Sequence, residues 1–291
     1  MTRALARPGA VVSIGFLTLI AAAALGAPLI AAWFGQHVTE TDLLSRYLPP
    51  SAEHWLGTDE VGRDVLLRLL YGARVSIAVG LVAAVLAALI GTAIGLVAGW
   101  FGGRFDAFLM RFTDGVIALP LLPLLIVLAA IDLRKLGLPP AITSGEQVSL
   151  YRIVAIIALV GWTTVARLVR GQTLALRARD FVRAAIAMGA GPWRIMLVHI
   201  LPNAVSPVIV ALSLAVGNVI LFESVLSFLG LGIQPPLPSW GNMLSNAQET
   251  IWQSPWLAVY PGVLILVTVA SCNLLGDAIQ AAFDPKRRLR R

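Results

Sequence analysis

Charged residues are scarce in this chain. Only 13% of its 291 residues are Asp, Glu, Lys or Arg, and 58% are apolar, whereas an average soluble domain is about 25% charged. A soluble core of this length cannot hide so much apolar surface, but a lipid bilayer can. The scarcity of charge therefore excludes an ordinary soluble domain and favours an integral membrane protein.

Cysteine and lysine are also rare. The single cysteine, Cys272, lies in an apolar run, which excludes a disulfide framework and favours a small buried side chain. The two lysines, Lys135 and Lys286, follow Arg134 and Pro285, so neither completes the Gly-Lys-Ser/Thr of a phosphate-binding loop. The three histidines are far apart, and no His, Cys and Asp group has metal-site spacing. We expect no catalytic residue, no metal and no ATP hydrolysis by this chain itself.

The net charge of +7 comes mainly from arginine, which supplies 20 of the 22 cations. Nucleic-acid binding would need a basic soluble domain with interleaved aromatic residues, which the sequence lacks. Membrane proteins commonly carry excess cations in their cytoplasmic loops. We therefore expect a lipid bilayer and no nucleic acid as a partner.

Six charge-free stretches approach the length of about 20 residues that a helix needs to cross a bilayer. The fourth has only 14 residues, but Arg152 and Arg167 at its ends can extend their side chains toward the membrane surfaces. Arg3 and Arg7 give the first stretch the look of a signal peptide, but its 24 residues are typical of a retained span. The sequence thus predicts an all-α, polytopic membrane protein with six spans, at 11–34, 75–103, 115–131, 153–166, 204–222 and 256–276.

The distribution of Lys and Arg predicts the orientation of these spans. With the N-terminus inside and all six spans present, the cytoplasmic side holds 15 of these residues and the outer side 7. Such a bias is typical of both termini lying in the cytoplasm, and it supports the short fourth span, because omitting it would place the C-terminus outside.

The loops expected outside are long. Residues 35–74 are mainly polar, and 65–71 have the pattern of a short amphipathic helix at the membrane surface. Residues 234–254 hold several prolines, which predicts a structured, turn-rich loop. Gly91, Gly95 and Gly99 recur every four residues in the second span and predict a close-packing face, either toward another helix of this chain or toward another chain.

The cytoplasmic loop 167–202 contains six arginines. Gly189 stands where a glycine ends a helix, and Pro192 suits the first turn of the next helix. We therefore predict an elbow of helix, glycine and helix along the inner membrane surface; the simpler alternative is a basic loop that contacts anionic lipids. The first helix is expected over 174–188, with Phe181, Val182, Ala185 and Ile186 on one face.

This elbow resembles a known family motif. Arg183-Ala184-Ala185, three residues, Gly189, and then Leu201-Pro202 resemble the EAA motif of the permeases of binding-protein-dependent ABC importers. That motif is Glu-Ala-Ala, three residues, Gly, nine residues and Ile-x-Leu-Pro. Arg183 replaces the Glu and His199 replaces the Ile, which puts the contact made by the Glu in doubt but leaves the spacing of the elbow unchanged.

Further segments resemble the oligopeptide, dipeptide and nickel permeases of this family, and most closely the C-type subunit of peptide importers. The resemblance covers nearly the whole chain. Its other segments are Trp55 to Asp59, Gly62 to Val65, Tyr71 to Arg74, His199 to Asn203, Glu223 to Gly232, Trp240-Gly241, Leu275 to Asp277 and Asp284-Pro285.

The resemblance implies a type I ABC importer permease fold in a bacterial plasma membrane. It implies a heterodimer with a homologous permease, cytoplasmic ATPase subunits that hold ATP and Mg, and an extracytoplasmic binding protein that delivers a peptide. Nickel is an alternative substrate, and a secondary transporter or channel is an alternative class. We divide the chain into an anchor helix plus outer loop (1–72), a permease domain (73–276) and a basic cytoplasmic tail (277–291).

The resemblance also implies that the elbow is the coupling helix that docks on an ATPase subunit. On that basis the small residues of the elbow allow the ATPase subunit to approach closely, and its polar residues contact that subunit. The expected coupling residues are Asp180, Arg183, Ala184, Ala185, Gly189, Leu201 and Pro202.

Four other residues are candidates for the translocation path or its gate. Glu223 is an acid in a long apolar run, about 20 residues from the start of its span, so it lies either at the outer interface or on a path. Pro120 and Pro123 predict a kink in the third span, and such kinks often face a cavity. Trp240 in the third outer loop is the fourth candidate.

Overall fold

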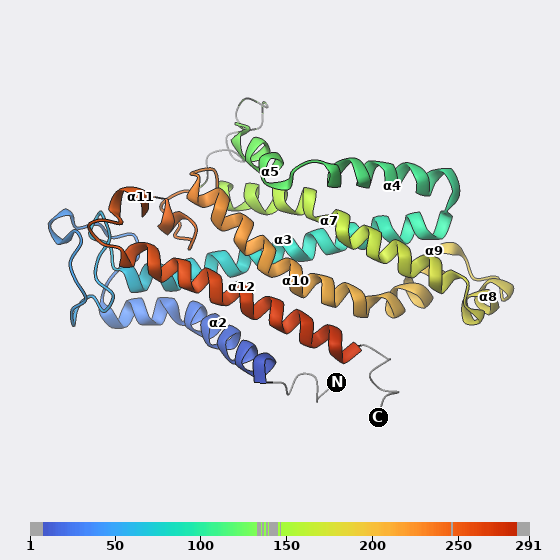
Figure 1. Cartoon of the computed structure of the whole chain (residues 1–291), viewed down its shortest axis with the longest axis horizontal. Coiled ribbons are helices and arrows are strands. Elements are labelled where there is room, and N and C mark those ends of the chain that lie inside the picture. The colour runs from blue at the N-terminus through green and yellow to red at the C-terminus, as the bar shows by residue number, and fades with distance from the viewer. Residues whose placement is uncertain are drawn as a thin grey trace.

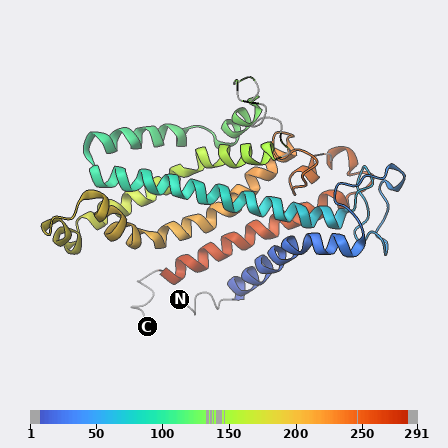
Figure 2. The same ribbon diagram turned by 180° about the vertical axis from the view of Figure 1, so that it is seen from behind.

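The computed structural model of the chain describes residues 8–132, 135, 137, 139, 145, 147–245 and 247–283. Within these ranges the chain is helical and forms no named strand, only one isolated bridge between Thr58 and Asp64. The long helices lie side by side, roughly along one direction (Figure 1, and from behind in Figure 2). The all-α prediction is confirmed.

The long helices are α2 (Pro8–Phe34), α3 (Val65–Phe101), α7 (Val148–Arg177), α10 (Leu201–Phe228) and α12 (Trp256–Phe283). Shorter elements connect them, and they are η1 (Leu43–Ser45), α4 (Gly103–Ala118), α5 (Leu121–Ala130), α8 (Asp180–Ala187), α9 (Pro192–Arg194), the π-helical η3 (Ile195–Ile200), η4 (Asn242–Leu244) and α11 (Ala247–Thr250). The chain is helical without a break from α9 through η3 to the end of α10.

Five helical segments are long and apolar enough to cross a membrane: α2, α3, α7, the continuous α9 to α10, and α12. The pair α4 and α5 also passes this test but is bent by 87°. If this pair counts as one span, the described ranges hold the six predicted spans. The predicted kink is confirmed, because α4 ends at Ala118 and Pro120, which cannot donate a backbone hydrogen bond, precedes α5.

The bundle of long helices has two ends, which we name the loop end and the elbow end. The loop end holds residues 35–64 and 229–255, at the left of Figure 1. The elbow end holds α8, α9 and the turn between α3 and α4, at the right of Figure 1. Helix α2 begins near the middle of the molecule and runs toward the loop end, and α12 runs the opposite way and ends nearer the elbow end.

Several helices are longer than the charge-free stretches that predicted them. The separate surface helix expected at 65–71 is wrong, since these residues are the first turns of α3, whose N-terminus is capped by the Asp64 carboxylate accepting from Leu67 N at 2.8 Å. The short fourth stretch is part of the 30-residue α7, whose arginines find partners. Residues 277–283 of the expected tail belong to α12, and 284–291 lie outside the described residues.

The glycine face of α3 packs against α7. A Cβ on Gly91 would lie 2.5 Å from Trp162 O, and one on Gly95 would lie 2.5 Å from Ala166 O. A Cβ on Gly99 would lie 2.6 Å from Thr173 Cβ. The close-packing face predicted from the sequence is therefore confirmed, and its partner is a helix of the same chain.

We predict that Gly95→Ala destabilises the protein by roughly 1–3 kcal/mol, because the added methyl group overpacks a backbone contact that cannot relax cheaply. The measurement is the midpoint of thermal unfolding in detergent. Gly171→Ala is the matched control, because Gly171 lies in α7 with open space around it and should gain about 0.5–1 kcal/mol of helix stability. Equal midpoints for the two variants would contradict the packing assignment.

Candidate functional site

The elbow joins α7 to α10. Helix α7 ends at Arg177, and α8 begins at Asp180 after an extended residue, Arg179, at ψ 149°. The single helix predicted over 174–188 is therefore wrong: the carbonyl of Arg179 accepts from Val182 N and Arg183 N and starts a new helix. This break makes α8 a short separate helix at the elbow end (Figure 1).

Helix α8 ends at Ala187, and Gly189 follows its C-cap residue Met188, as the sequence predicts for a glycine that stops a helix. The φ of Gly189 is +83°, a left-handed conformation that costs other residues energy. Gly189 N donates to Ile186 O at 2.9 Å and Ala190 N donates to Ala185 O at 3.0 Å. These two bonds form a Schellman motif, which satisfies carbonyls that the helix end would leave free. Gly189 thus sets a defined bend.

One face of α8 anchors the elbow to the rest of the chain. Val182 and Ala185 are buried in a cluster with Ile195, Met196 and side chains of α3 and α7. The face predicted from the sequence also included Phe181 and Ile186, but these lie at its edges and stay 43% and 49% exposed. The elbow is therefore fixed on one side and apolar on part of its exposed side.

The expected coupling residues do not all face outward. Asp180, Arg183 and Ala184 are exposed on α8, and Gly189 is exposed with nothing near the position of a Cβ. Ala185 contacts its own chain, so its small size serves packing within this protein. Pro202 is exposed and Leu201 is half-buried in the first turn of α10.

Sequence reasoning missed two features of the elbow. Met188 and Trp193 are 80% and 62% exposed, and together with Phe181 and Ile186 they make an apolar surface. Exposed apolar surface of this kind often marks a contact with another protein. The second feature is the π-helix η3, where Leu201 N donates to Met196 O; π-helical turns are frequent at functional sites. No simple residue pattern predicted it.

A cavity of about 1120 Å³ lies between the helices. Its walls come from α3, α4, α5, α7, α10 and α12 and from Leu119 between α4 and α5, and they are mainly apolar. Polar groups in the walls include Asn218, Thr164 and Ser206, and Asp277 is their one ionisable side chain. A half-open cavity of this size accommodates a small organic molecule or a short peptide.

The four residues expected on a path or gate lie outside this lining. Glu223 is completely buried, and its carboxylate accepts from Ser76 Oγ of α3 at 3.1 Å and from Ser227 Oγ at 2.7 Å. Trp240 is buried next to it, where its backbone N donates to Ser76 Oγ and its indole N donates to Leu69 O. Glu223 and Trp240 thus fasten the loop after α10 to α3 and α10.

The two prolines are placed differently. Pro120 is exposed at the 87° bend, and Pro123 lies in the first turn of α5, where no backbone donor is needed. Neither lines the cavity, but Leu119, Leu121 and Leu125 beside them do. The bend therefore shapes the cavity wall, while the role of the prolines in a path stays a prediction.

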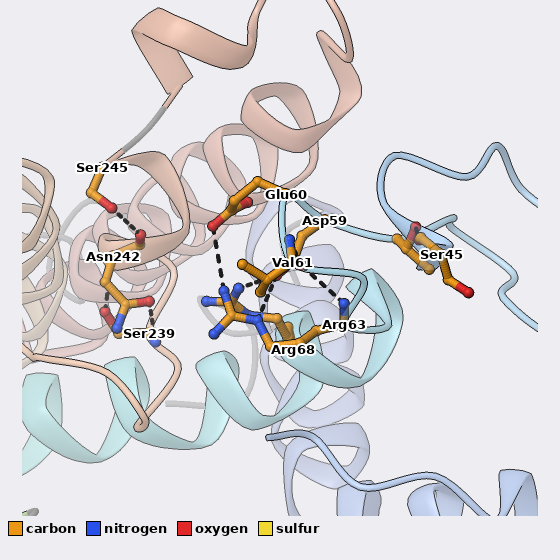
Figure 3. Close-up of polar contacts among 10 residues, drawn as sticks. Ser45, Asp59, Glu60, Val61, Arg63, Arg68, Ser239, Asn242 and Ser245 are labelled. Carbon is orange, nitrogen blue, oxygen red and sulfur yellow. Dashed lines mark hydrogen bonds and ion pairs between the residues drawn. The ribbon is translucent and has the colours of Figure 1, made fainter. Parts of the chain in front are cut away.

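A buried ion cluster orders the loop end (Figure 3). Asp59 accepts from the Arg63 guanidinium at 2.8 Å, pairs with Arg68 of α3, and accepts from Val61 N and Arg63 N at 2.9 Å. Burial alone would raise the pKa of Asp59, but Arg68, these backbone amides and Arg63 hold the pKa below its usual value. The cluster fixes residues 58–64 at the start of α3.

Within the described residues, no three His, Cys, Asp or Glu side chains are grouped to hold a metal ion. The expectation that this chain holds no cofactor stays a prediction.

Comparison with known proteins gives a consistent result. Residues 91–289 match the family described as binding-protein-dependent transport system inner membrane component. The oligopeptide transport system permease protein OppC of Bacillus subtilis (strain 168) is 37% identical over 279 residues, which cover 96% of this chain and 86% of that protein. The dipeptide transport system permease protein DppC of Alkalihalophilus pseudofirmus is 39% identical over 279 residues, which again cover 96% of this chain and 86% of that protein. The probable D,D-dipeptide transport system permease protein DdpC of Escherichia coli (strain K12) is 39% identical over 259 residues, or 89% and 82% of the two chains.

We predict that Glu223→Ala loosens the loop after α10. The substitution leaves the buried hydroxyls of Ser76 and Ser227 without their acceptor, which should cost about 1–3 kcal/mol. Hydrogen exchange should speed up at the amides of Ile233 and Trp240, which depend on these serines. The control is Glu249→Ala, an exposed acid of α11. Exchange that matches the wild-type protein would refute this role of Glu223.

We predict that Asp59→Asn destabilises the loop end by about 3 kcal/mol, because it leaves Arg68 buried without its charged partner. Glu60→Gln, which touches the same cluster through a longer and more exposed contact to Arg63, should cost less than about 1 kcal/mol. Thermal unfolding of both variants measures the difference.

The ion pair of Asp59 and Arg68 makes the stability of the folded protein depend on pH. The folded protein lowers the pKa of Asp59, so the ionised carboxylate stabilises the folded state. This contribution is complete at neutral pH and is lost only as the pH falls below about 4. Asp59→Asn should remove this acid-dependent part of the unfolding profile. A variant that loses stability in acid as steeply as the wild-type protein would contradict the assignment.

Proposed function

The chain belongs to the family of binding-protein-dependent transport system inner membrane components, and we propose that it is a permease subunit of an ATP-driven importer of oligopeptides or dipeptides. It is a multi-pass inner membrane protein of this family. In the proposed importer this chain forms half of the translocation pathway and does not itself hydrolyse ATP.

The observation that carries the proposal is the elbow. It is rigidly bent at Gly189, anchored by Val182 and Ala185, and apolar on its exposed side around Phe181 and Met188. A fixed bend can transmit a push from a docked protein, whereas a mobile basic loop on a lipid surface cannot. We infer that the docked protein is a cytoplasmic ATPase subunit, which holds ATP and Mg.

We assign the coupling role of each elbow residue from the solvent exposure of its side chain. Asp180 and Arg183 supply polar contacts to the ATPase, and Ala184 and Gly189 allow it to approach closely. Ala185 supports the elbow from its buried side. Leu201 and Pro202 join the elbow to α10.

The proposed orientation places the elbow end in the cytoplasm. Helix α2 runs away from this end and α12 runs toward it, which supports cytoplasmic termini together with the excess of Lys and Arg in the same loops. The loop end then faces outward, where an extracytoplasmic binding protein delivers the substrate. Glu223 and Trp240 act as gate residues by fastening the outer loop above the cavity rather than by lining it.

Peptide is favoured over nickel as the substrate. The similar proteins are named as oligopeptide and dipeptide permeases. The mainly apolar cavity also suits a peptide better than a hydrated divalent cation, which prefers oxygen, nitrogen or sulfur ligands. The second, homologous permease completes the pathway around this cavity.

We predict that Gly189→Trp leaves membrane insertion intact and abolishes ATP-dependent peptide uptake. A Cβ at this position meets no atom of its own chain within 4 Å, so the expected effects are strain at φ +83° and a bulky obstacle on the docking surface. The measurement is uptake of labelled di- and oligopeptides into proteoliposomes that contain the complete importer.

Gly15→Trp is the control, because Gly15 lies on an exposed face of α2 with open space around it. Normal uptake by Gly189→Trp would contradict the coupling role of the elbow. Uptake by the wild-type complex that persists without ATP would instead indicate a secondary transporter or channel.

A further inference from the structure

Helix α4 is held in place in an unusual way. Its only buried side chains are those of Asp106 and Thr113. Its phenylalanines at 105, 108 and 112 are 49% or more exposed, and its apolar attachment includes the stacking of Phe112 on Trp162 of α7, at 6.1 Å between ring centroids, and the packing of Val116 near its C-terminal end. Two ion pairs to α7 supply the polar attachment.

The first pair joins Asp106 to Arg170. Arg170 Nε donates to Asp106 Oδ1 at 2.5 Å and Arg170 Nη2 donates to Asp106 Oδ2 at 2.6 Å. This two-bond geometry fixes direction as well as distance. The Asp106 side chain is 12% exposed and that of Arg170 is 33% exposed, so this pair is less open to solvent than the second pair, whose side chains are about half exposed.

The second pair joins Asp114 to Arg167, whose Nη2 donates to Asp114 Oδ1 at 2.5 Å. The i, i+3 spacing of Arg111 and Asp114 would allow an ion pair within α4, but Asp114 pairs with the arginine of α7. The two acids lie eight residues apart, so α7 holds α4 at two points about 12 Å apart along its axis.

Both ends of α4 are joints rather than continuous helix. Gly102 and Gly103 precede or begin it at φ +65° and +58°, conformations that glycine adopts easily. The 87° bend at Leu119 and Pro120 follows it. With a joint at each end, α4 is held between them by the two ion pairs and by the stacking of Phe112 on Trp162.

The α7 side of these pairs is rigid and leads to the elbow. Gly95 brings the backbones of α3 and α7 into contact. Arg177, the last residue of α7, donates to Trp100 O at 2.7 Å and lies over the Trp100 ring. Helix α8 follows α7 after two residues, so a force on the elbow acts directly on α7.

The other end of α4 reaches the cavity. Val116 and Ile117 of α4 and Leu119 at the bend line it, next to Leu121 of α5. A movement of α4 therefore changes the shape of the cavity wall. The contacts form a continuous physical connection from the elbow through α7 and the ion pairs to that wall.

We propose that Asp106–Arg170 and Asp114–Arg167 are positioning pairs that transmit movement of the elbow to the cavity wall through α4. This inference rests on the proposed function, because it assumes that a nucleotide-driven partner moves the elbow. It adds the residues that convert this movement into a change of the cavity.

The test measures distances between spin labels in the complete importer in proteoliposomes, after Cys272, the single native cysteine, has been replaced by Ala. One label pair, Leu174 of α7 and Leu19 of α2, reports movement of the elbow side. A second pair, Phe108 of α4 and Leu266 of α12, reports movement of α4. All four positions are exposed and none lines the cavity. The probe is MgATP with vanadate, which requires no transported substrate.

We expect MgATP with vanadate to shift both distances in the protein with native ion pairs. Arg170→Ala combined with Asp114→Ala should keep the α7 shift and lose the α4 shift. The exchange of partners, Asp106→Arg with Arg170→Asp, should restore the α4 shift. Arg111→Ala is the matched control, since Arg111 is an exposed cation of α4 that forms no ion pair among the described residues. Both label distances in this variant should shift as they do in the native protein.

Three outcomes would overturn the proposal while leaving the proposed function intact: an α4 shift that survives loss of both pairs, an α7 shift in the native protein without an α4 shift, or an exchanged pair that fails to restore the α4 shift. The absence of any α7 shift would overturn the proposed coupling by the elbow and, with it, this inference. Failure of the exchanged pair to restore the shift would show that the charges act structurally and not as a transmitting contact.

Discussion

The backbone contact between α3 and α7 is the constraint on which the rest of the structure depends. In a bilayer, apolar side chains gain little by leaving lipid, so helices associate where small residues let their backbones approach. Gly91, Gly95 and Gly99 provide this approach. Helix α3 starts at the buried ion cluster of the loop end, and α7 leads into the elbow, so this one contact connects the two ends of the molecule.

Polar contacts then fix the positions of loops and helices that apolar packing alone does not fix. Lipid offers no hydrogen bonds, so each polar side chain inside the bundle favours the arrangement in which it is satisfied. Glu223 selects the position of the outer loop through Ser76 and Ser227. Arg170 selects the position of α4 through Asp106. These few contacts specify geometry, while the apolar surface specifies only that the helices lie in the membrane.

The sequence was sufficient for features that depend on local chemistry. The long membrane helices, the bend at Pro120, the stop at Gly189 and the glycine face of α3 all follow from periodicity, backbone freedom or side-chain size. Features that depend on distant partners were missed. Charge was taken as the limit of a span, yet α7 continues past Arg167 to Arg177, and the Arg167 side chain pairs with Asp114 of α4. The coupling and gating roles of the site residues stay predictions.

The two ends of the molecule are stabilised by different means, and this difference bears on how the protein works. At the loop end, buried polar networks around Asp59 and Glu223 fix the chain against α3 and α10. At the elbow end, α8 is anchored by one apolar face, and α4 is positioned by ion pairs between two joints. A networked end resists movement, whereas a jointed end with discrete contacts can change between arrangements. A force that enters at the elbow would therefore be taken up mainly around α4 and the cavity, with the loop end serving as the fixed support.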